Sequence, residues 1–280
     1  MAEESGVLAD REEDGWLVVS NRVPEVKYTC LLLPGLLCTD LIFHSLLKDP
    51  QMIQDGILLE AANPPGFKGQ PLPPDFRAGI KEYATLVENF LAKRKYDLVV
   101  GHSFFGNVLI EISRRANYKG TLVLISPSLQ RSAEPTDTRL LDWLSRKPIL
   151  RNLAWSFSYK MLRSLFKPYF VEASIRQLEA VVTDAKLTPS SVAGMQLMGF
   201  FNYLGKYPDL STLLSNVQGQ IWYVRGENDN IILTEQNRNQ LAQNRHIKLV
   251  DIPGSRHFVM LEKPKELGLL FRQMLNVKEQ

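Results

Sequence analysis

The sequence predicts an α/β protein with a mainly parallel, doubly wound sheet and an inserted helical cap. Short apolar runs alternate with amphipathic stretches over residues 28–127 and again after residue 217. Such alternation is typical of parallel strands joined by helices. Between these two parts, residues 128–216 lack a convincing buried strand and show helical spacing broken by prolines. A strand also changes into a helix within a few residues at 101–106.

The first half of the chain supplies most of the expected strands. Residues 1–14 are polar and acid-rich, and we interpret them as a loose leader, so residues 1–27 comprise this leader and a first strand. Residues 76–94 place apolar side chains at a spacing of 3.6 and predict an amphipathic helix. Short apolar runs predict strands at 16–20, 28–33, 56–62, 98–100 and 121–125.

The second half begins with the expected cap, residues 128–216, and then returns to the sheet. Its segments after the cap are strands at 220–224 and 247–252 and helices at 234–244 and 265–275. Thr234 is the expected N-cap of the first of these helices. The core domain is therefore expected to comprise residues 28–127 and 217–280.

One serine lies between a predicted strand and a predicted helix. Residues 98–100 form the strand, residues 107–113 show helical spacing, and only 101–106 separate them. A turn this short needs glycine where the backbones approach each other. Ser103 at its apex would expose its hydroxyl, and the amide that follows would point at a developing oxyanion. This arrangement suits a nucleophile; the alternative is a loop of no chemical consequence.

The turn resembles the nucleophile elbow, Gly-x-Ser-x-Gly, of the α/β-hydrolase superfamily. Gly101, His102, Ser103 and Gly106 agree with the elbow, whereas Phe105 stands where the family has a glycine. Because helix and sheet pack closely at that position, Phe105 predicts a less tight elbow or a locally displaced helix.

The loop after the strand at 28–33 also resembles the family. Pro34 and Gly35 end that strand, as in the family's oxyanion loop. The resemblance implies that the backbone amides of Leu36 and Phe104 form an oxyanion hole. A plain strand-ending turn is the alternative.

Two later loops resemble those that carry the family's acid and base. Gly-Glu-Asn-Asp at 226–229 implies Asp229 as the acid, and Gly-Ser-Arg-His at 254–257 implies His257 as the base. The chain order Ser, Asp, His is that of the family. The resemblance covers residues 28–127 and 217–276 and leaves the cap outside it.

Other acids and histidines fit these roles less well. Glu227 comes too early in the Gly-x-x-Asp pattern, and Asp251 lies within a predicted strand. His102 lies in the elbow, where the resemblance implies a side chain turned away from the nucleophile. His246 precedes a strand and has no matched acid loop. His44 lies in the oxyanion loop, where we expect it to pack or to bind substrate.

Aromatic side chains are dense in the cap. They suit an apolar acyl or ring pocket, although a core internal to the cap would explain them equally. The candidate substrate contacts are His44, Phe105, Trp155 and Phe200.

One cap segment combines charge with helical spacing. Lys160, Arg163 and Lys167 recur opposite apolar residues. A basic amphipathic helix can rest on an anionic membrane surface or receive an acidic carrier. A solvated helix face is the alternative.

Composition excludes several classes of function. The net charge is only +3, and neither basic clusters nor zinc-type Cys and His spacings occur, so no nucleic-acid partner is expected. Cys30 and Cys38, the two cysteines, fit a reducing compartment better than a disulfide framework. The N-terminus lacks the pattern of a secretory signal, and no apolar run reaches the roughly 20 residues of a membrane span. A cytoplasmic protein is expected.

The resemblance implies a serine hydrolase that acts on a small-molecule acyl substrate and needs neither a metal nor an organic cofactor. The aromatic cap favours a carboxylic ester. Thioester hydrolysis, acyl transfer, carbon–carbon hydrolysis and perhydrolysis use the same three residues and stay open. An aspartate-nucleophile enzyme is disfavoured because the elbow apex is Ser103. A binding protein that kept the fold and lost catalysis is the alternative from another class, and Phe105 motivates it.

Overall fold

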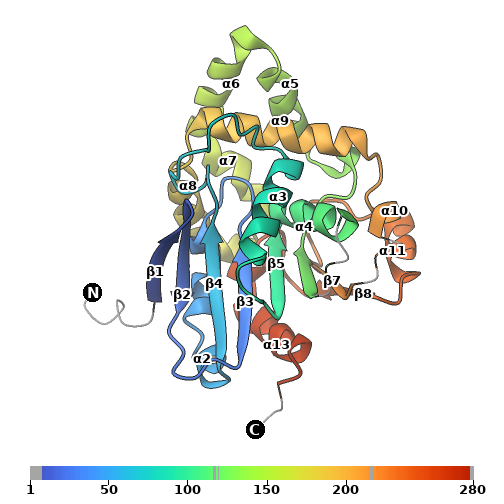
Figure 1. Ribbon diagram of the computed structural model, residues 1–280. Helices are drawn as coiled ribbons and strands as arrows, with labels where there is room; N and C mark the ends of the chain where they lie inside the picture. Colours follow the sequence, from blue (N-terminus) through green and yellow to red (C-terminus); the bar gives the residue numbers. More distant parts are fainter. Residues whose placement is uncertain (1–7, 116–117, 119, 215–216, 218, 278–280) are drawn as a thin grey trace.

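The computed structural model describes residues 8–115, 118, 120–214, 217 and 219–277 (Figure 1). Their centre is one sheet with strand order β1-β2-β4-β3-β5-β6-β7-β8. Strands β1 and β2 pair antiparallel, as do β2 and β4, and all other neighbours pair parallel. The strands are β1 (Leu8–Glu13), β2 (Trp16–Asn21), β3 (Tyr28–Leu33), β4 (Ile57–Asn63), β5 (Leu98–His102), β6 (Thr121–Ile125), β7 (Ile221–Gly226) and β8 (Ile247–Ile252).

Helices flank the sheet and fill the long connection between β6 and β7. The helices near the sheet are α1 (His44–Leu47), α2 (Pro50–Gln54), α3 (Ile80–Leu91), α4 (Phe104–Arg115), α11 (Glu235–Ala242), α12 (Val259–Glu262) and α13 (Pro264–Met274). The helices between β6 and β7 are α5 (Thr136–Ser145), α6 (Pro148–Lys160), α7 (Leu162–Phe166), α8 (Ile175–Ala185), α9 (Ser190–Lys206) and α10 (Ser211–Leu214).

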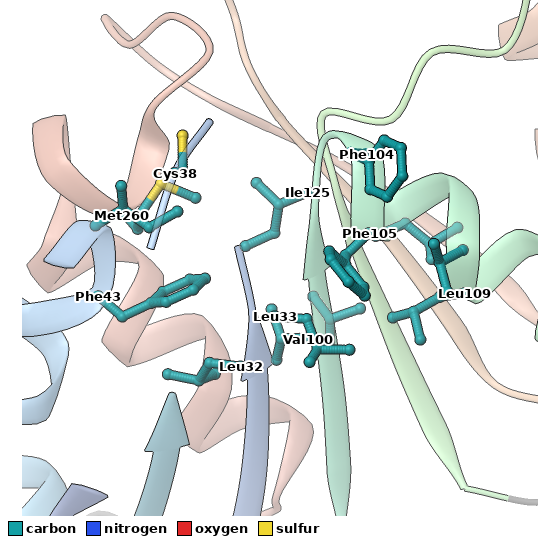
Figure 2. Packing of buried hydrophobic residues seen from close by; sticks show 14 of the residues in the cluster. Leu32, Leu33, Cys38, Phe43, Val100, Phe104, Phe105, Leu109, Ile125 and Met260 are labelled. Atoms are coloured by element: carbon teal, nitrogen blue, oxygen red, sulfur yellow. The ribbon is translucent and has the colours of Figure 1, made fainter. Parts of the chain in front are cut away.

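The core lies on both faces of the central strands. Figure 2 shows Phe43 and Met260 on one side of the strand residues Leu33 and Val100, and Phe105 on the other side. All five side chains are fully buried. Buried strands with helices on both faces read as continuous apolar runs, which explains why the sequence predicts these strands so directly. The sheet is doubly wound, as predicted.

The N-terminal segment differs from its prediction. Residues 1–14 were expected to be a leader, but Leu8–Glu13 is a strand that pairs with β2. Asp14 and Gly15 join the two strands with positive φ angles of 50° and 77°, as a two-residue hairpin turn requires. Arg11 of this edge strand forms an ion pair with the buried Glu60 at 2.6 Å. An edge strand buries little apolar surface. The sequence of β1 is therefore polar and lacks the apolar pattern from which the other strands were predicted.

Helices α5 to α9 lie beyond the carboxyl ends of the central strands (Figure 1). The basic helix expected around Lys160, Arg163 and Lys167 is interrupted: α6 ends at Lys160, α7 begins at Leu162, and Lys167 starts a 3₁₀ turn. Within the described residues, no helix has both the length and the apolar character needed to cross a bilayer.

Candidate active site

Ser103 lies at the apex of a sharp turn between β5 and α4. Its φ angle is 50°, a left-handed conformation that is uncommon for serine. Its amide donates to the Ile125 carbonyl at 2.8 Å, and its carbonyl accepts from the Asn107 amide at 3.1 Å. Two backbone hydrogen bonds therefore hold the strained residue between the neighbouring strand β6 and the first turn of α4.

The two glycines of this turn are required by close backbone contacts. A Cβ atom at Gly101 would lie 2.5 Å from the Phe105 carbonyl oxygen, and one at Gly106 would lie 3.0 Å from Cβ of Pro127. Strand β5 ends at His102 and α4 begins at Phe104, so only Ser103 separates the strand from the helix. The expected loosening of the elbow at Phe105 is absent.

Phe105 does not contact the cavity described below, contrary to its prediction as a substrate contact. Its ring is fully buried and lies 5.4 Å, between centroids, from Phe67 and from Tyr83. The side chain points from α4 into the core between helix and sheet (Figure 2). Phe105 is therefore part of the packing beneath the elbow.

Asp229 and His257 lie together at the carboxyl ends of β7 and β8. Nδ1 of His257 is 3.1 Å from Oδ1 of Asp229. The Ile231 amide donates to the same carboxyl oxygen at 2.9 Å. Burial opposes ionisation of Asp229, but the attraction and hydrogen bond of His257 outweigh it and lower the pKa of that carboxyl. Asp229 is therefore a buried carboxylate oriented toward one ring nitrogen of His257.

The acid and histidine loops meet because Gly226 has no side chain. A Cβ atom there would lie 2.0 Å from the Arg256 carbonyl oxygen and 2.6 Å from that of Ser255. The Asn228 amide donates to the Ser255 carbonyl at 2.9 Å. Since β7 and β8 are parallel neighbours, both loops leave the same edge of the sheet. These contacts fix the position of one loop relative to the other.

Gly35 brings the loop after β3 against the elbow. A Cβ atom at Gly35 would lie 3.2 Å from Cβ of Ser103 and 2.7 Å from Nδ1 of His102. Leu36 follows and lines the same cavity as Ser103 and Phe104. The Phe104 amide is at the first position of α4, where helical amides have no partner within the helix. Both segments expected to supply oxyanion-hole amides therefore border Ser103.

A cavity of about 160 Å³ joins these groups to the helices between β6 and β7. Ser103 and His257 line it, as do Trp155 and Phe200, two of the expected substrate contacts. Most of the remaining wall is apolar and includes Leu36, Leu141, Leu162, Leu197, Phe166 and Phe258. An apolar cavity with a few polar groups suits a small molecule that has an apolar part and one reactive polar group.

Glu134 lines this cavity and was not anticipated from the sequence. Burial raises the pKa of Glu134 to about 7. Tyr169, another wall residue, accepts a hydrogen bond at its backbone carbonyl from the His257 amide at 3.3 Å. Both residues come from the segment between β6 and β7, where no strand pattern or motif singles out a polar side chain.

The remaining histidines have other partners. His44, an expected substrate contact, is not among the cavity residues; its Nε2 lies 2.8 Å from Asp40, four residues earlier. His102 donates from Nε2 to the His257 carbonyl at 3.1 Å. Burial, with the nearby His257, lowers the pKa of His102 well below its usual value, so His102 is neutral. Nowhere in the described residues do three His, Cys, Asp or Glu side chains gather as a metal site requires.

Solved structures of several hydrolases share this fold at low sequence identity. A thermophilic esterase from Thermogutta terrifontis aligns with a TM-score of 0.69 and 15% identity, over 96% of this chain and 98% of that chain. An enol-lactonase from Burkholderia xenovorans aligns with a TM-score of 0.72 and 11% identity, over 96% and 100%. An epoxide hydrolase aligns with a TM-score of 0.69 and 13% identity, over 96% and 98%.

Comparison of the sequence with known proteins identifies a family but no individual curated relative. No curated protein matches the sequence. The profile of the Alpha/beta hydrolase family matches residues 30–267, which include most of β3 and the loops that carry Ser103, Asp229 and His257. The chain therefore belongs to the alpha/beta hydrolase family and is a hydrolase of that type.

Proposed function

We propose that this hydrolase cleaves a carboxylic ester that has an apolar or aromatic acyl or alkyl group, through an acyl-enzyme on Ser103. The proposal rests on the hydrogen bond between Asp229 and His257 and on a single cavity that both His257 and Ser103 line. Nδ1 of His257 faces Asp229, which leaves Nε2 for proton transfer. The lowered pKa of Asp229 keeps a negative charge beside the imidazolium that forms.

The reaction runs in two halves. The Ser103 oxygen adds to the acyl carbon while Nε2 of His257 takes the hydroxyl proton, and the carbonyl electron pair moves onto oxygen. The amides of Leu36 and Phe104 bind this oxyanion. The carbonyl re-forms as the ester C–O bond breaks, and His257 gives its proton to the leaving alcohol. Water, deprotonated by His257, then releases the carboxylic acid from Ser103 by the same route.

We further propose that residues 128–216 act as a cap that determines the substrate. The apolar part of the cavity wall comes largely from this segment, through Leu141, Trp155, Leu162 and Phe200. Glu134 and Tyr169 of the same segment add polar groups near His257. This distribution favours an ester whose apolar group packs against the cap while its carbonyl meets Ser103.

The test is turnover of p-nitrophenyl esters from acetate to palmitate, together with an aromatic ester and a lactone. Replacing Ser103 with alanine is expected to lower kcat by about 10³-fold or more. The matched control is Ser113→Ala in α4, the helix that follows Ser103; the Ser113 hydroxyl donates to the Ile110 carbonyl, and turnover of this variant should match the wild type. Full activity in a folded Ser103→Ala protein would contradict the proposal.

A further inference from the structure

The hairpin formed by α5 and α6 carries an apolar outer surface, which we call the cap tip. Ile149 is 91% exposed, Leu153 69% and Phe157 63%. Seven of the eleven exposed large hydrophobic side chains among the described residues lie between positions 140 and 161. Soluble proteins rarely gather exposed apolar side chains in this way unless the surface binds something. The cap-tip residues are Leu140, Trp143, Ile149, Leu150, Leu153, Phe157 and Met161.

Helix α6 has two apolar faces with different surroundings. Ile149, Leu153 and Phe157 are four residues apart and lie along one exposed stripe. Trp155 is 2% exposed and lines the cavity. The internal packing of the cap therefore accounts for the inner face of α6 and leaves the outer stripe unexplained.

The segment that carries this stripe is rich in basic residues, and only some of them are paired with acids. Residues 143–171 contain six Lys and Arg side chains and no Asp or Glu. Arg146 pairs with Asp142 of α5, and Arg163 pairs with Glu179 of α8. Within the described residues, Lys160 and Lys167 have no carboxylate partner, and both are exposed. The surface thus combines exposed apolar groups with uncompensated cations.

We propose that the cap tip docks on the surface of an anionic lipid bilayer. Apolar side chains would enter the boundary between headgroups and acyl chains, and Lys160 and Lys167 would meet anionic headgroups. A second copy of this chain fits less well, because a symmetric contact would bring the same cations together. The hairpin also projects farther from the sheet than the other helices of the segment between β6 and β7 (Figure 1).

Docking there would bring the cavity close to the lipid. Thr138 and Leu141 of α5 and Trp155 of α6 line the cavity, so the helices that touch the bilayer also form the cavity wall. An apolar ester could then pass from the lipid phase to Ser103. This step rests on the proposed function, whereas the docking itself does not.

The test is co-sedimentation of the full chain with vesicles of phosphatidylcholine, with and without phosphatidylserine. We expect binding to the anionic vesicles at low salt, and weaker binding at high salt because the charges are screened. Reversing two charges, in Lys160→Glu/Lys167→Glu, should weaken binding about tenfold or more. The apolar change Ile149→Ser/Leu153→Ser should also weaken it strongly.

The matched control is Lys265→Glu/Leu269→Ser, an exposed basic and apolar pair on α13, which should bind as the wild type does.

Three outcomes would overturn the proposal. One is a failure of the wild type to sediment with anionic vesicles at low salt, and another is equal loss of binding in the α13 control. The third is a dimer of the wild type that Ile149→Ser/Leu153→Ser converts to a monomer in light scattering, which would assign the surface to a second copy. Far-ultraviolet circular dichroism checks that each variant is folded. Because sedimentation needs no turnover, a failure of docking and a failure of the proposed hydrolysis give separate results.

Discussion

The carboxylate of Asp229 and the imidazole of His257 lie 3.1 Å apart, with only 1% and 5% of their side chains exposed. Both loops are held by backbone contacts that need glycine at 226, so the pair is fixed before any substrate binds. A hydrogen bond shielded from water orients the imidazole ring, and the attraction of His257 lowers the pKa of the Asp229 carboxyl.

Replacing Asp229 with asparagine is expected to lower kcat by about 10³- to 10⁴-fold while the fold persists. The amide keeps the shape but removes the charge and permits the wrong tautomer of His257. Steady-state turnover of a p-nitrophenyl ester measures the effect. Asp10→Asn is the control, because Asp10 is exposed on β1, at the opposite edge of the sheet. Equal losses in the two variants would remove Asp229 from the mechanism.

Replacing Gly35 with alanine should lower kcat about 10²-fold, because the new Cβ atom would press against His102 and displace the loop that carries the Leu36 amide. Gly205→Ala is the control: its Cβ atom would meet only Arg131 Nη1, at 4.0 Å. That variant should retain turnover. Wild-type kinetics in Gly35→Ala would show that this loop does not position a catalytic group.

Replacing Phe105 with alanine should destabilise the protein by about 3–5 kcal/mol, as expected for a large cavity in a packed core. The ring is fully buried against Phe67 and Tyr83. Urea denaturation measures the change, and Phe157→Ala, at a position 63% exposed, should change stability by only about 0.5 kcal/mol. A small effect at Phe105 would contradict its assignment to the core.

Glu134 should make folding stability depend on pH between about 4.5 and 7. Its pKa is about 7 in the folded chain and 4.5 as an ordinary glutamate. The folded state therefore binds the extra proton, and stability falls as pH rises through this window. The shift corresponds to about 3 kcal/mol. Urea midpoints of wild type and Glu134→Gln should diverge between pH 5 and 8, with the variant less sensitive. Parallel curves would contradict the buried, titrating carboxyl.

The buried strands and helices could be predicted because the spacing of their apolar residues fits only one type of element. Val99 and Val100 belong to an apolar run that is buried on both faces of the sheet. The amphipathic pattern of 76–94 corresponds to α3, Ile80–Leu91. Strand β1 was missed because its residues are polar and only edge pairing orders them. The turn residues Asp14 and Gly15 were the signal that could have revealed the hairpin.

The positions of the candidate catalytic residues could be predicted from motifs at the ends of strands. The residues that line the cavity depend on tertiary packing and were harder to predict. The loops that carry Ser103, Asp229 and His257 follow the parallel strands β5, β7 and β8 and leave the same edge of the sheet, as the motifs imply. Phe105 and His44 were expected in the cavity, but the Phe105 ring is buried in the core and His44 contacts Asp40. Glu134 has no motif, because its role depends on helices folding over the sheet.

Labelling with a fluorophosphonate probe, followed by peptide mapping, tests whether Ser103 is an activated nucleophile. We expect a covalent adduct on Ser103 in the wild type and its loss in His257→Ala, since the serine needs that base to be nucleophilic. No adduct on folded wild-type protein, or an adduct on another serine, would contradict an activated Ser103 and favour a binding protein on the same fold.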